Sequence, residues 1–216
     1  SVTGATFSAG ADGVSAGVES ASVGSTSIKD VSGSVALGDD VSASGSMGSY
    51  TNVGTDITGG SFSAGPDGVN AGLESATWGG TKVENVSGQA QVGALSAQGS
   101  MGSFDNTDSV TGATFSAGAD GVSAGVESAS VGSTSIKDVS GSVALGDDIS
   151  AGGSMGSYTN VGTDVEGASF SAGPDGVKAG VDSATWGGTK VENVSGQAQV
   201  GALSAQGSMG SFDNTD

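Results

Sequence analysis

Several residue types on which catalysis and phosphate recognition depend are missing from the sequence. The 216 residues include no cysteine, no histidine and no arginine, and only two prolines. Without these side chains there is no imidazole base, no thiolate nucleophile and no soft-metal cluster. The bidentate phosphate clamp that arginine provides is absent as well. We therefore expect neither enzymatic activity nor a bound cofactor.

Positive charge and long apolar runs are also scarce. Five lysines stand against 23 acidic residues, which gives a formal net charge of −18. Such a charge repels nucleic acids and anionic membrane surfaces. No apolar run approaches the roughly 20 residues that a membrane-spanning helix needs. We expect no nucleic-acid partner and no membrane insertion.

Glycine is abundant, at 42 residues, and the sequence repeats itself. Residues 1–56 recur almost unchanged at 109–164, and residues 57–108 recur at 165–216. The segments 1–56 and 57–108 are also similar to each other. The chain is thus one continuous array of four repeats of about 54 residues, in the order A, B, A′, B′.

Apolar and polar residues alternate with a period of two, which predicts β-strands. In the first repeat this alternation predicts four strands, over residues 2–10, 13–23, 26–37 and 41–52. The turns between them, such as Gly-Ala-Asp-Gly, Pro-Asp-Gly and Gly-Gly, favour hairpins. We predict an all-β, tandem-repeat antiparallel β-meander ribbon, cross-β-like, with about four short strands per repeat. The alternative is a β-solenoid with parallel rungs.

The alternation is interrupted once in every predicted strand. Two polar residues stand between Val18 and Ala21, for example, and the other strands carry similar interruptions. If the turns are as predicted, the flanking apolar residues form two rows across the sheet: Ala5, Val18, Val31 and Met47 in one, and Val2, Ala21, Ile28 and Tyr50 in the other. An interruption in one strand would be a β-bulge. Shared by all strands, it predicts a lengthwise bend of the whole sheet.

Two kinds of candidate site stand out in the turns and at the bend. Asp12, Asp39 and Asp40 lie in predicted turns, where Asp favours local hydrogen bonds. Clustered carboxylates are also ligands for Ca²⁺, so these residues are the candidates for a calcium site. Asn85 and Asn193 each begin an Asn-Val-Ser sequence, which matches the acceptor pattern for N-glycosylation.

The two ends of the sequence point to self-assembly. Setting the last residues beside Ser1 recreates the sequence that joins residue 108 to residue 109. Two open sheet edges of matching phase polymerise unless they are capped, and this contact is head to tail and does not close. We expect a secreted structural protein that forms a fibre or coat from copies of itself. The expected edge residues are Val2, Phe7, Met209 and Phe212.

Three other functions are consistent with the sequence. A repeat adhesin or carbohydrate-binding module would use Trp78 and Trp186, although a lone Trp on the apolar side of a strand is expected to fill a gap in a core. A regular array of Ser and Thr hydroxyls is compatible with ice binding. The turn carboxylates are compatible with a calcium- or mineral-associated matrix protein.

Overall fold

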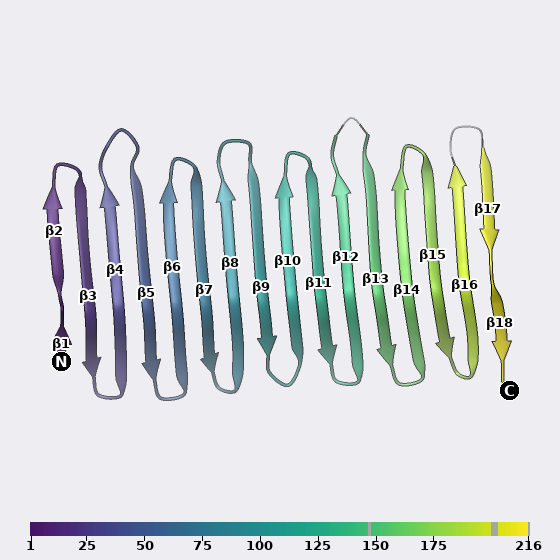
Figure 1. The fold of residues 1–216 in the computed structure, drawn as a ribbon, viewed down its shortest axis with the longest axis horizontal. Coiled ribbons are helices and arrows are strands. Elements are labelled where there is room, and N and C mark those ends of the chain that lie inside the picture. The colour runs from purple at the N-terminus through teal and green to yellow at the C-terminus, as the bar shows by residue number, and fades with distance from the viewer. Residues whose placement is uncertain (147, 200–202, 216) are drawn as a thin grey trace. The chain divides into compact units, whose positions relative to one another are not determined.

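The computed structural model describes residues 1–146, 148–199 and 203–215, and every regular element in them is a β-strand (Figure 1). The chain divides into two compact units, Ser1–Asn106 and Thr107–Asp216. The described residues contain no helix long and apolar enough to cross a membrane. The all-β prediction is confirmed.

Each unit is an open antiparallel meander in which successive strands pair with each other, apart from one divided edge strand in each unit. The first unit contains β1 (Val2–Thr3), β2 (Thr6–Gly10), β3 (Gly13–Val23), β4 (Thr26–Ala36), β5 (Ser42–Asn52), β6 (Thr55–Gly65), β7 (Gly68–Trp78), β8 (Thr81–Gln91) and β9 (Ser96–Asp105). The second contains β10 (Ser109–Gly118), β11 (Gly121–Val131), β12 (Thr134–Ala144), β13 (Ser150–Asn160), β14 (Thr163–Gly173), β15 (Gly176–Trp186), β16 (Thr189–Gln199), β17 (Ser204–Ser208) and β18 (Ser211–Asn214). Every strand pairing among the described residues is antiparallel, so the parallel rungs of the alternative β-solenoid are not formed there.

The observed strands of the first repeat follow the predicted ones closely, with one difference. The predicted strand 2–10 is divided into β1 and β2, which both pair with β3. The same division separates β17 from β18, which both pair with β16. Both divisions fall at the interruption of the alternation. Backbone hydrogen bonds still cross at these points, from the N–H of Glu19 to the carbonyl of Gly4 and from the N–H of Gly210 to the carbonyl of Glu192.

Short turns fix how the strands are aligned. At the turn from β7 to β8, Gly79 and Gly80 have φ values of 53° and 84°. Two successive residues with positive φ match the twist of a two-residue hairpin, and glycine adopts this conformation without a steric cost. Each such turn leaves one possible pairing of its two strands, and therefore fixes the register.

The predicted row beside the interruption is present in the structure. In the first unit, successive pairings join eight residues across the sheet: Val2, Ala21, Ile28, Tyr50, Ile57, Ala76, Val83 and Phe104. In the second unit the equivalent row is Val110, Ala129, Ile136, Tyr158, Val165, Ala184, Val191 and Phe212. Of the other predicted row, Val18 and Val31 are direct partners.

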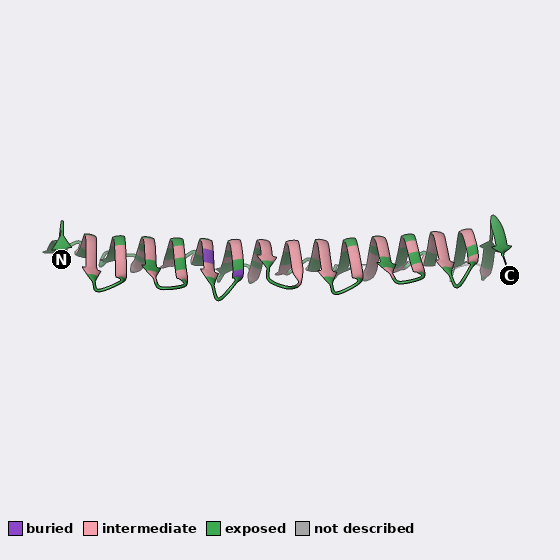
Figure 2. Ribbon diagram, turned by 90° about the horizontal axis from the view of Figure 1, so that it is seen from below, coloured by how far each residue is buried: buried purple, intermediate pink, exposed green. Residues whose placement is uncertain are grey.

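The interruption is a corner at which alternate strands adopt a left-handed backbone. Four of these left-handed residues are not glycine: Asp30, Asn85, Asp138 and Asn193, each with φ of 53°. On β6, β10 and β14, and between β1 and β2, the left-handed residue is a glycine. These glycines are Gly59, Gly112, Gly167 and Gly4, with φ between 61° and 63°. Asn, Asp and Gly are the residues that tolerate this conformation best. Figure 2 shows the strands arched rather than flat, as the predicted bend requires.

Two backbone hydrogen bonds show what the corner does to the alternation. The N–H of Glu19 donates to the carbonyl of Gly4 over 3.3 Å, and the N–H of Ser22 donates to the carbonyl of Ser1 over 2.8 Å. Hydrogen-bonded pairs in a regular antiparallel ladder are separated by an even number of residues. Here the two hydrogen-bonded pairs, Gly4–Glu19 and Ser1–Ser22, are three residues apart along each strand. The corner therefore shifts the alternation by one residue, and the apolar rows on its two sides lie on the same face of the sheet.

The sheet of each unit is a single layer with almost no core. Among the described residues, the only buried apolar side chain is Ala76, which is 5% exposed, and the only buried polar one is Thr81. Figure 2 correspondingly shows residues that are almost all intermediate or exposed. Large apolar side chains on the strands therefore remain in contact with solvent.

Candidate assembly surfaces

The edge strands β1 and β2 of the first unit and β17 and β18 of the second carry the apolar residues predicted for assembly. Val2 is 63% exposed and Phe7 is 74% exposed on the edge formed by β1 and β2. Phe212 lies on β18 and is 59% exposed, and Met209, between β17 and β18, is 58% exposed. The structure thus places all four predicted edge residues at accessible positions, and their role in assembly remains a prediction.

The edge strands also point backbone donors away from their units. Because Gly4 and Glu19 form a hydrogen-bonded pair, the ladder places Phe7 and Ala9 in non-hydrogen-bonded pairs with β3. Their N–H groups therefore face away from β3. At the other edge the N–H of Thr215 donates to Gly188, so that the N–H of Asn214 faces away from β16. Such groups are a template for a further strand.

One face of each unit is apolar over the half of the strands that lies toward the upper turns in Figure 1. We call this half the upper limb, and this side of it the apolar face. In the first unit its middle row is Phe7, Ala16, Gly33, Gly45, Phe62, Ala71, Gly88 and Gly99. In the second it is Phe115, Ala124, Gly141, Gly153, Phe170, Ala179, Gly196 and Gly207.

The apolar face is hollowed beside its phenylalanines. Phe62 is 46% exposed, and it borders a hollow of about 350 Å³ that Gly33 and Gly45 also line. In the second unit Phe170 and Gly153 line a hollow of about 600 Å³ with Met155 and other residues of the same limb. Since glycine has no side chain, the face alternates between projecting rings and depressions.

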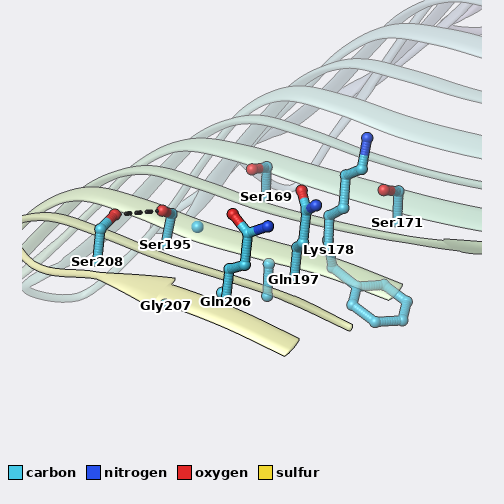
Figure 3. A pocket seen from close by; sticks show the side chains of 12 residues that line it. Ser169, Ser171, Lys178, Ser195, Gln197, Gln206, Gly207 and Ser208 are labelled. Atoms are coloured by element: carbon cyan, nitrogen blue, oxygen red, sulfur yellow. Dashed lines mark hydrogen bonds between the residues drawn. The ribbon is translucent and has the colours of Figure 1, made fainter. Parts of the chain in front are cut away.

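The opposite face of the upper limb is polar and is held by hydroxyl pairs. Ser32 and Ser46 form a hydroxyl–hydroxyl hydrogen bond of 2.7 Å, and Ser87 and Ser100 form another of 2.7 Å. Figure 3 shows this face at the end of the second unit, where Lys178, Gln197 and Gln206 stand on the same side of the ribbon as the Ser195–Ser208 pair. These residues contribute to a hollow of about 440 Å³.

Two ion pairs lie on the lower limb, which is the half of the strands beyond the corner. Lys82 and Glu84 are 2.6 Å apart on β8, and Ser103 donates a hydrogen bond of 3.0 Å to Glu84. The Lys82 ammonium, followed by the Ser103 hydroxyl, holds the pKa of Glu84 below its ordinary value. In the second unit Lys190 and Glu192 form the equivalent ion pair, which raises the pKa of Lys190 and lowers the pKa of Glu192. All these groups are solvent-accessible, so the pairs contribute little to stability.

The predicted turn and sequon residues are all on the surface. Asp12 is exposed in the turn between β2 and β3, and Asp39 and Asp40 are exposed in the loop between β4 and β5. In the part of the chain that the structure describes, no three or more His, Cys, Asp or Glu residues are grouped so that they could hold a metal ion. Asn85 and Asn193 are exposed at the corner. The calcium and glycosylation assignments stay predictions.

One expectation about the aromatic residues is wrong. Trp78 and Trp186 were expected to fill gaps in a core, but they are 45% and 47% exposed. The reason is that the unit has one layer, so no second sheet covers them.

The glycines of the apolar face lie where the sequence pattern places them. Their signal was present in the sequence, because Gly33 and Gly45 occupy positions where the alternation requires an apolar side chain.

Comparison with known proteins gave no relative: no family model, no curated protein and no solved structure matches this chain. The functional inference therefore depends on the residues and surfaces described above.

Proposed function

We propose that the protein is structural and builds an extracellular fibre or coat, with copies adding end to end through their β-edges. The observation that carries this proposal is the match between the two edges. Val2 begins an apolar row at one edge, and Phe212 ends the equivalent row at the other. Setting these edges side by side pairs an aromatic with a β-branched residue, which is a favourable cross-strand pair.

The contact that follows from this match is heterologous. One copy uses the edge of β1 and β2, and the next uses the edge of β17 and β18, so that each addition leaves both kinds of edge available. Contacts of this type produce open filaments rather than closed oligomers. The backbone donors of Ala9 and Asn214 supply the hydrogen bonds of the new ladder.

The charge of the chain restrains other modes of association. The net charge of −18 is carried partly by exposed residues at the corner, such as Glu19 and Asp30. Mutual repulsion at low ionic strength opposes the sideways clumping of filaments, while the edge contact is made by backbone groups and apolar side chains.

The test is electron microscopy and fibre diffraction of the 216-residue chain. We expect filaments with a meridional reflection at ~4.8 Å, the strand spacing. The double variant Ala9→Pro with Asn214→Pro removes one outward N–H from each edge, and we expect no filaments from it. The matched control, Ala9→Ser with Asn214→Ser, keeps both N–H groups and should assemble. If the proline variant forms filaments as readily as its control, edge pairing does not build them.

A carbohydrate-binding role is the second candidate, and the exposure of Trp78 and Trp186 favours it. An accessible indole is a platform on which a sugar ring can stack. Such binding would shift the fluorescence of the tryptophans when glycans are added, whereas a purely structural protein would show no shift.

A further inference from the structure

The middle row of the apolar face has a regular order of large and small residues. Along successive strands of the first unit the order is Phe, Ala, Gly, Gly, and the same four residues then follow again. The second unit repeats the order from Phe115 to Gly207. Within each unit the two rings are four strands apart, or about 19 Å at the usual strand spacing, and two glycines follow each ring in the row.

Most of the glycines in this row are not required by the unit itself, although a Cβ at Gly153 would lie a tight 3.2 Å from the carbonyl oxygen of Ser140. A Cβ at Gly88 or Gly196 would meet no heavy atom within 4 Å. At Gly99 the nearest atom, the carbonyl oxygen of Ser87, would be at an ordinary 3.6 Å. The φ values of these glycines are not positive. Because glycine in a strand interior costs about 0.5–1 kcal/mol relative to alanine, their presence needs another cause.

Other glycines of the sheet have an internal cause. A Cβ at Gly48 would lie 2.9 Å from the Cβ of Asp30, and one at Gly102 would lie 2.9 Å from the Cβ of Asn85. These corner glycines make room for a side chain on the neighbouring strand. By contrast, the glycines of the middle row leave depressions that open outward, beside Phe62 and Phe170.

We propose that a second copy of this chain packs face to face on the apolar face, with the phenylalanines of each copy seated in the glycine depressions of the other. This contact goes beyond the proposed end-to-end growth, because it uses the face of the sheet rather than its edges. It makes the assembly two layers thick and covers the residues that a single layer leaves exposed.

The fit is self-complementary under a twofold axis. Consider an axis that runs parallel to the strands, midway between the two copies, over the gap between β5 and β6. It reverses the strand order, so that Phe62 of one copy faces Gly45 of the other, and Phe7 faces Gly99. The same operation places Ala16 on Gly88 and Gly33 on Ala71. Every pair combines a larger with a smaller residue, and each contact is made twice, as an isologous interface requires.

The available area is close to that of a stable interface. Eight strands at ~4.8 Å and five residues at ~3.4 Å per strand give a face of about 650 Å² for each unit. Stable protein–protein interfaces bury about 800 Å² per partner, so the face of one unit supplies most of this area. The neighbouring row adds half-exposed side chains such as Val14 and Val35, which are 40% and 42% exposed.

The experiment uses the full chain with both edges blocked by Ala9→Pro and Asn214→Pro, so that face pairing is measured without filament growth. Analytical ultracentrifugation of this protein should show a concentration-dependent dimer. Adding Gly99→Val fills one depression and should weaken the dimer about tenfold or more, because the opposing ring can no longer be seated. The matched control is Gly180→Val on the polar face, where the nearest atom to a Cβ is a carbonyl oxygen at 3.5 Å. It should leave the dimer unchanged.

The outcomes separate this proposal from the proposed function. A monomer at all concentrations, with an unaltered β-sheet circular dichroism spectrum, overturns face pairing and leaves end-to-end growth of the unblocked chain untouched. A dimer that Gly99→Val and Gly180→Val weaken equally, or not at all, also overturns it. If Gly99→Val alone weakens the dimer, face pairing is supported even where the unblocked chain forms no filaments. Phe62→Ser is a second variant that should weaken the dimer, because it removes the ring that the depression of the other copy receives.

Discussion

The left-handed residue in the middle of β8, Asn85, allows a direct test of what bends the sheet. Its φ is 53°, a conformation that costs an L-residue about 1–2 kcal/mol and a β-branched residue more. Asn85→Val should therefore lower the free energy of unfolding by about 2 kcal/mol. Asn85→Gly removes the side-chain strain but adds backbone entropy to the unfolded chain, so its effect should stay within about 1 kcal/mol.

The loss in the free energy of unfolding grows with the number of left-handed residues that are replaced. Equivalent residues, Asp30, Asp138 and Asn193, have the same φ, and the two such residues within each unit lie four strands apart, or about 19 Å. Substitutions at that separation add almost independently. Valine at all four positions should cost roughly 4–8 kcal/mol, which is comparable to the whole stability of a typical domain. We expect the quadruple valine variant not to fold and the quadruple glycine variant to fold.

Urea unfolding followed by circular dichroism is the assay, carried out in the edge-blocked protein so that filaments do not interfere. Midpoints are compared rather than extrapolated energies, because repeat arrays can unfold in more than one step. Gln89→Val, at an exposed position on the same strand, is the control for placing valine on β8. The reasoning is refuted if Asn85→Val and Gln89→Val have the same urea midpoint. It is also refuted if Asn85→Gly lowers the midpoint as much as Asn85→Val does.

Three further predictions concern the corner, the ion pairs and the charge. Gly48→Ala places a Cβ against Asp30 and should cost about 1–3 kcal/mol, and adding Asp30→Gly should recover most of that loss in the same urea assay. In an NMR titration, the Glu84 carboxyl should titrate below the ordinary glutamate pKa, and Lys82→Ala should remove most of that lowering, because the hydrogen bond from Lys82 is its largest cause. Because the Glu84 pKa is lowered on folding, its small stabilising effect is present above the ordinary glutamate pKa and is lost as the pH falls through the lowered value. Acidification from pH 7 to pH 3 should cause filaments to bundle, since carboxylates lose their charge, and unchanged light scattering over that range would contradict it.

The rows of the sheet could be predicted because short turns leave the register no freedom. Once Gly24 and Ser25 are taken as a turn, Ala21 must lie opposite Ile28, and a pairing shifted by one residue would turn apolar side chains to the other face. The same reasoning extends across every hairpin of a unit. Periodicity and turn chemistry together were therefore sufficient for the strands, their order and the bend.

Other features could not be read from the same pattern. The left-handed backbone occurs at Asp30 but not at Glu19, although both are acidic residues at the corner, and alternation does not distinguish them. The exposure of Trp78 was not predictable either, because a strand in a single layer and a strand in a sandwich have the same alternation. Whether an apolar face is covered depends on the arrangement of layers, which is a tertiary property.

The meander topology has a mechanical consequence. Each strand pairs with strands next to it in the sequence, so tension applied at the two ends of a unit would load the hairpins one after another. The inter-strand hydrogen bonds would then break one after another, rather than all at once along a whole strand. A unit of this kind should lengthen gradually under a modest pulling force, releasing slack hairpin by hairpin, and should close again from any hairpin that remains intact, because its turns bring neighbouring strands back together.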